Sequence, residues 1–147
     1  MRFLFICLLI AWAVFQTSMA QARDTEYRLK IDEVLRSPDY QQRVGSDVAF
    51  YFAGQKAPGT DQTFGEYVTN KKTNSAGKSD QDACRWAMLS ALLELRERAT
   101  KMGGDAVTNI VSYYKKQTVS SETEYVCHAG AIIAGVALKG TVVKLKK

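Results

Sequence analysis

The chain has 147 residues, 46% of them hydrophobic, which is enough to bury a core, and a formal net charge of +5. This modest positive charge suits solubility or weak contact with anionic envelope surfaces. It falls short of the concentrated basic stripe that is typical of nucleic-acid-binding proteins, so we expect no nucleic-acid partner.

The first 22 residues have the pattern of a secretory signal peptide. A basic start precedes the apolar run Leu4–Phe15, which is shorter than the roughly 20 residues that a membrane span needs. Ala20 and Ala22 mark the cleavage site, and Ser18 with Ala20 offers another. Cleavage after Ala22 makes Arg23 the mature N-terminus and predicts a periplasmic protein. The alternative is an uncleaved membrane anchor.

Residues 23–147 have the length of a single domain, and no further apolar run predicts a transmembrane segment. Alternation over Glu26–Ile31 predicts a first strand. Ser37 and Pro38 have the N-cap and first-turn pattern of a short helix that Gly45 ends. The pattern of Asp47–Phe52 then predicts a second strand.

Gly, Lys, Asn, Thr and Ser dominate residues 53–78, which we interpret as surface loops with one short strand at Phe64–Val68. Ser79 can cap the one strongly helical segment, in which apolar residues recur at helical spacing. Gly103-Gly104 provides the left-handed cap that ends this helix.

β-branched and aromatic residues predict strands over 105–114 and 122–128, and apolar β-type sequence continues over 129–145, so that two or three strands follow the helix. Glycines interrupt the last of these segments, which indicates bulges, bends or close backbone approach. The expected fold class is therefore α+β, with one long helix packed on a small, mostly antiparallel sheet and a short N-terminal helix.

Two cysteines, Cys84 and Cys127, remain after cleavage of the signal peptide. In an oxidising compartment an even pair in a small domain indicates a disulfide. A reduced pair and a metal-bound pair are the alternatives. His128 could join the two cysteines as a metal ligand because thiolate and imidazole suit zinc or copper. Neighbouring strand residues point to opposite faces, however, so we expect no metal.

His128 is the only histidine, and it could serve a hydrolase as a base. No Gly-x-Ser-x-Gly motif surrounds any serine, so we expect no catalytic residue. Two glycine pairs, Gly130 with Gly135 and Gly135 with Gly140, have the spacing of a phosphate-binding loop. Neither is followed by the Lys and Ser or Thr that such a loop needs. We therefore expect neither ATP nor any other cofactor.

Three segments resemble a family of small exported proteobacterial proteins commonly labelled "excinuclease ATPase subunit": residues 79–87, 97–116 and 120–131, with Gly103-Gly104-Asp105-Ala106-Val107 and Cys127-His128-Ala129-Gly130 among their motifs. The likeness spans nearly all of residues 23–147. The label implies a DNA-repair ATPase, but the chain has neither a phosphate loop nor zinc-finger cysteine spacing. The resemblance thus implies family membership and no particular activity.

More distantly, the helix that ends at Gly103 and the strand that follows are similar to the core of the RcsF and YbjQ-like superfamily. RcsF is an envelope stress sensor that binds partners and is held together by disulfides. This likeness covers about a third of the chain and does not extend to RcsF's lipidation cysteine.

The leading hypothesis is a non-enzymatic periplasmic domain that binds a protein or an envelope component and is stabilised by a Cys84–Cys127 disulfide. One alternative is a thiol- or metal-responsive envelope protein that uses Cys84, Cys127 and His128. The other is a hydrolase that uses His128.

Overall fold

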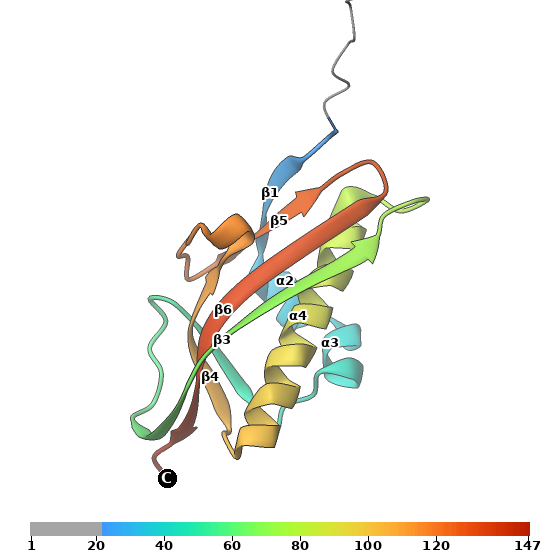
Figure 1. The fold of residues 1–147 in the computed structure, drawn as a ribbon. Coiled ribbons are helices and arrows are strands. Elements are labelled where there is room, and N and C mark those ends of the chain that lie inside the picture. Colours follow the sequence, from blue (N-terminus) through green and yellow to red (C-terminus); the bar gives the residue numbers. More distant parts are fainter. Residues whose placement is uncertain (1–21) are drawn as a thin grey trace, which may run out of the picture.

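The computed structural model describes residues 22–147, so the predicted signal peptide lies, except for Ala22, outside the described residues. Figure 1 shows the strands and helices in chain order. They are β1 (Thr25–Lys30), α2 (Ile31–Leu35), α3 (Pro38–Arg43), β2 (Ala49–Phe52), β3 (Thr60–Asn74), α4 (Asp80–Met102), β4 (Ala106–Ser112), the short 3-10 helix η1 (Tyr114–Lys116), β5 (Glu124–Ala129) and β6 (Ile133–Leu145).

The long helix α4 begins and ends at the residues that the sequence indicates. The hydroxyl of Ser79 accepts a hydrogen bond from the Asp82 amide at 3.1 Å, which satisfies one of the free N–H groups of the first turn. Gly103 ends the helix in the left-handed conformation, with a φ of 82°. The predicted apolar stripe is buried except for Met102, which lies in the last turn and is exposed.

The strands form one curled sheet around β6. Along one edge, β6 pairs with β3 from Ile133↔Asn74 to Leu145↔Thr60. Along its other edge it pairs first with β5 and then with β4, both antiparallel. The sheet continues from β5 to β1 at one end of β6, and from β4 to the parallel strand β2 at the other.

Helix α4 packs against β3 and β6 and supplies much of the core (Figure 1). Its buried residues are Ala83, Cys84, Ala87, Met88, Leu89, Ala91, Leu92, Leu95 and Ala99. Alternate residues of β6, Val136, Leu138 and Val142, are buried in the same cluster. The core therefore lies between the helix and one face of the sheet. The opposite face of the sheet carries the side chain of His128 and its partners.

The fold class predicted from the sequence, an α+β domain with a small sheet and one short N-terminal helix, is wrong. The described chain is dominated by its sheet, with 41% of residues in strands and 29% in helices. Within residues 22–147 the sheet has six strands, and there are three α-helices, of which only one is long. Two short helices, α2 and α3, precede β2 where the sequence predicts one.

The largest error concerns β3, which occupies 15 residues where loops with one short strand at Phe64–Val68 are predicted. Among the described strands β3 pairs only with β6, so it is an edge strand. One of its faces is turned to solvent, and Thr69 is its one fully buried residue. An edge strand needs few apolar residues and commonly carries lysines, which discourage pairing with other molecules. Its composition is therefore easily mistaken for that of a loop.

Candidate functional site

Strand β5 directs Cys127 and His128 to opposite faces of the sheet, as the alternation of a strand requires. Cys127 lies toward α4 and forms a disulfide with Cys84, with the two Cα atoms 5.8 Å apart. Both cysteines are fully buried. The predicted disulfide is confirmed, and it joins the long helix to β5.

The structure therefore does not bring Cys84, Cys127 and His128 together. Both sulfur atoms are used in the disulfide, and the imidazole lies on the far side of the sheet. Within residues 22–147 no three His, Cys, Asp or Glu side chains are arranged to hold a metal ion. The hypothesis of a metal-responsive site on these three residues has no geometric support.

On the sheet face away from α4, His128 is held by residues from two distant segments. Its Nδ1 lies 2.9 Å from a carboxylate oxygen of Asp24, just before β1. Its ring stacks on Tyr114 of η1, with centroids 3.7 Å apart and planes inclined by 12°. Its Nε2 lies 3.8 Å from a carboxylate oxygen of Glu26. We call these residues, with Lys115, the His128 cluster.

Asp24 links the N-terminal segment to η1 as well as to β5. It accepts hydrogen bonds from Lys115 Nζ at 3.2 Å and from His128 Nδ1. Partial burial acts to raise the pKa of Asp24, but the bonds from Lys115 and His128 outweigh it and hold the pKa below its ordinary value. An ionised carboxylate can only accept, so Nδ1 carries the hydrogen and Nε2 faces Glu26.

The η1 turn that carries Tyr114 has an unusual backbone. Lys115 and Lys116 both have positive φ, 49° and 63°, a conformation that side-chain-bearing residues rarely adopt. Such backbone persists where surrounding contacts impose it. Here the stacking of Tyr114 on His128 and the ion pair of Lys115 with Asp24 supply those contacts.

A pocket of about 270 Å³ opens beside His128. Ser112 also lines it, but its hydroxyl accepts a hydrogen bond from the Val126 amide at 2.9 Å. The Asp24–His128 pair resembles the orienting half of a hydrolase triad, in which the carboxylate fixes the imidazole. Within residues 22–147 no serine or threonine hydroxyl is hydrogen-bonded to His128, so the cluster holds an oriented base without an adjacent nucleophile.

A second feature lies at the end of the sheet where β5 turns into β6. Ile132 and Ile133 are 64% and 48% exposed there, in the turn and at the start of β6. The loop between β3 and α4 lies against this turn, because the Ser75 amide donates to the Ile132 carbonyl at 2.9 Å. We call the four exposed residues Ala76, Ala131, Ile132 and Ile133 the apolar tip.

The sequence reasoning missed the apolar tip and the partners of His128. Residues 129–145 continue the apolar β-type composition of the preceding strand, so the pattern predicts a bulge or bend at Gly130 and not a hairpin turn. The signal for the tip is present, because two isoleucines and an alanine directly follow a glycine where a turn normally carries polar residues. Asp24 has no comparable signal, because 104 residues separate it from His128.

Comparisons with protein-family models, with curated proteins and with solved structures find no match. The resemblances to the exported proteobacterial family and to the RcsF and YbjQ-like superfamily therefore stay predictions. Over residues 22–147, no helix is long and apolar enough to cross a bilayer.

Proposed function

We propose that the protein is an exported, disulfide-stabilised domain that acts in the periplasm by binding a protein or an envelope component. The exposed apolar tip carries this proposal. Export is supported by the signal-peptide pattern of residues 1–22, and a stable disulfide suits an oxidising compartment.

The apolar tip supports binding because folding does not require these side chains. Ile132 and Ile133 are largely exposed, while Val136, Leu138, Val142 and Val143 further along β6 are buried. Single exposed apolar residues are common, but adjacent ones that line one hollow are typical of contact surfaces. Such a hollow is present, and its lining residues are Lys72, Thr73, Asn74, Ala76, Ile132 and Ile133.

The groups that could do chemistry have structural partners in the fold. The disulfide lies in the core, where a reductant or a substrate has no access to either sulfur. The His128 ring is hydrogen-bonded to Asp24 and stacked on Tyr114. These contacts support a binding role over a thiol-responsive one, because redox-active cysteines need exposure.

In-cell photocrosslinking tests the proposal. A photoreactive amino acid placed at Ile132 in the full chain is expected to form a discrete covalent adduct with its partner when living cells are irradiated. Mass spectrometry of the adduct then identifies protein, lipid or cell-wall material. The same amino acid at Val68 is the matched control, because Val68 is 55% exposed on β3 but lies outside the apolar tip.

Adducts at Ile132 that are absent at Val68 support a specific contact at the tip. Equal adducts from the two positions, or none from Ile132, would contradict binding through the tip. Far-ultraviolet circular dichroism of both purified variants confirms that the substitutions leave the fold intact.

A further inference from the structure

We propose that the apolar tip docks on an anionic lipid surface, with Ile132 and Ile133 entering the headgroup region and Lys72 and Lys78 contacting lipid phosphates. This inference rests on the proposed binding function and names its partner. Three features of the molecule support it: the chemistry of the turn, the charge around the turn and the place where the chain enters the domain.

The turn between β5 and β6 is closed by a hydrogen bond from the Gly130 amide to the Ile133 carbonyl at 2.8 Å. Residues at the apex of such a tight connection are normally Gly, Asn or Asp, which suit its backbone and remain hydrated. Here Ala131 and Ile132 occupy the apex and are exposed. Backbone geometry does not call for an isoleucine at this position, so its apolar surface points to a contact outside the chain.

Basic residues flank the tip. Lys72 lines the same hollow as the isoleucines, and the Lys78 ammonium donates to the Asn74 carbonyl at 3.3 Å beside that hollow. Within residues 22–147 neither lysine forms an ion pair. An apolar surface bordered by cations is the pattern of segments that insert at an anionic membrane interface.

The acid at the start of α4, Asp80, is paired within the fold. Its carboxylate accepts a hydrogen bond from each of the two terminal nitrogens of Arg23, at 2.8 and 2.9 Å. The Tyr27 hydroxyl donates to the same carboxylate at 2.7 Å. These bonds hold the pKa of Asp80 below its ordinary value, and its charge is neutralised by Arg23. Lys72 and Lys78 therefore give this end of the molecule an excess of positive charge.

Arg23 also fixes where the preceding chain joins the domain. Its guanidinium donates to the Gly130 carbonyl at 2.5 Å, which places it against the turn that carries the tip. Figure 1 shows the start of β1 at the same end as this turn, with the C-terminus at the opposite end. In the precursor, before cleavage after Ala22, a signal peptide inserted in a membrane would be joined directly to Arg23 and would hold the tip against that bilayer.

The size of the tip favours a lipid surface over a protein. A stable protein interface buries roughly 800 Å² on each partner and uses about 20–30 residues a side. Two isoleucines and two lysines make a much smaller contact, which suits reversible interfacial binding. Surfaces of this kind bind through shallow insertion together with attraction to headgroup charge.

Vesicle binding tests the inference with protein purified from cells that express the full chain. One set of vesicles contains phosphatidylcholine alone, and the other an equal mixture of phosphatidylcholine and phosphatidylglycerol. We expect binding to the mixed vesicles only, and weaker binding as salt concentration rises. Replacing the lysines with Lys72→Gln and Lys78→Gln is expected to lower the partition coefficient about fivefold for each charge removed.

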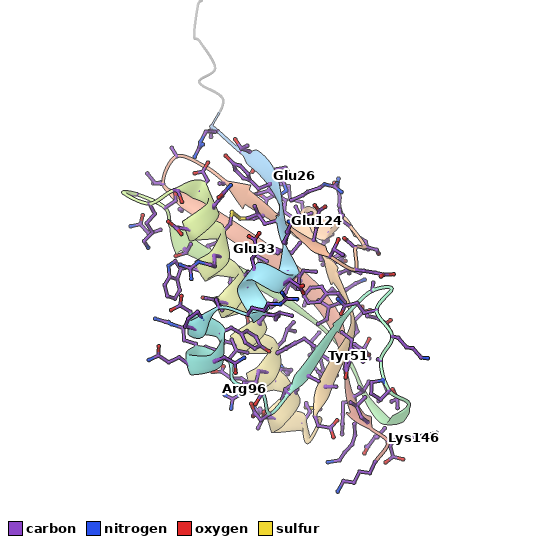
Figure 2. The ribbon with its side chains drawn as sticks, turned by 180° about the vertical axis from the view of Figure 1, so that it is seen from behind. Glu26, Glu33, Tyr51, Arg96, Glu124 and Lys146 are labelled. Atoms are coloured by element: carbon purple, nitrogen blue, oxygen red, sulfur yellow. A yellow bond between two sulfur atoms is a disulfide. The ribbon has the colours of Figure 1, made fainter. Side chains whose placement is uncertain are left out.

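The double variant Ile132→Ser/Ile133→Thr is expected to lower the partition coefficient about tenfold or more. Two matched controls should leave it unchanged. Val68→Thr removes an equally exposed apolar residue outside the tip. Lys146→Gln/Lys147→Gln removes two charges at the far end, where Figure 2 shows Lys146 well away from Glu26 on β1. Thermal unfolding of each variant confirms that it is folded.

Three results would overturn the inference: no binding of the unmodified protein to either kind of vesicle, equal binding to both, or tip variants that bind as tightly as the controls. If vesicle binding fails while Ile132 still crosslinks to a protein in cells, the lipid partner is wrong and the proposed binding function stands. If both experiments fail, the tip has no binding role.

Discussion

Replacing both cysteines, Cys84→Ala/Cys127→Ala, is expected to lower the free energy of unfolding by about 4 kcal/mol. The disulfide closes a loop with a sequence separation of 43 residues, which restricts the unfolded chain. It also ties α4 to β5 within the core, where both sulfur atoms are buried. Urea unfolding followed by circular dichroism measures the loss.

The matched control is Ser90→Ala on the exposed side of α4, where the hydroxyl donates only to the Trp86 carbonyl. We expect its free energy of unfolding to change by less than about 0.5 kcal/mol. The unmodified protein, unfolded and refolded in the presence of reductant, should approach the double variant. A loss below about 1 kcal/mol for the double variant would show that the disulfide is not a main support of the fold.

Gly104→Ala is expected to lower the free energy of unfolding by about 3 kcal/mol, the upper end of the range for overpacking. A Cβ atom at this position would lie 2.9 Å from the Val143 carbonyl oxygen and 2.7 Å from a methyl carbon of Val142. The carbonyl belongs to β6 and accepts a hydrogen bond from Asp105, so it has little freedom to move. Chemical unfolding again measures the loss.

Gly103→Ala provides the comparison for Gly104→Ala. A Cβ at Gly103 meets no atom within 4 Å, but the φ of 82° strains any residue with a side chain. We expect a loss of about 1 kcal/mol, the usual cost of a left-handed residue other than glycine. If Gly103→Ala proves more destabilising than Gly104→Ala, the close approach of β6 is not what requires the second glycine.

The sequence predicted those elements whose signals are local. The cap at Ser79 and the glycines after α4 define that helix because each acts on neighbouring backbone groups. Ser37 and Pro38 likewise start α3, and the Val44 cap and Gly45 end it. The pairing of Cys84 with Cys127 followed from their number and from the predicted compartment.

The size of the sheet could not be predicted in the same way. Strand β3 is defined by its pairing with β6 along its whole length, and few of its own residues are apolar. Pairing between distant segments produces no local residue pattern by which a polar strand can be recognised. Helix α2 was missed for a related reason, because it is only five residues long and has no side-chain cap.

The surroundings of His128 depend on the same long-range pairing. Strand β1 lies antiparallel to β5 with Glu26 opposite His128, and this register brings Asp24 to the imidazole. Tyr114 stacks on the ring, and the left-handed residues Lys115 and Lys116 directly follow it. Single-sequence patterns contain neither the register nor the turn, so the His128 cluster could be found only in the folded chain.

Intact-mass measurement of the protein recovered from the periplasm, with and without reduction before alkylation, tests most directly whether this is an exported and disulfide-closed domain. We expect a chain that begins at Arg23 and takes up two alkyl groups only after reduction and unfolding. A chain that retains residues 1–22 would contradict cleavage of the signal peptide. Two thiols that alkylate without reduction would contradict the disulfide, and Cys84, Cys127 and His128 would again be candidate functional residues.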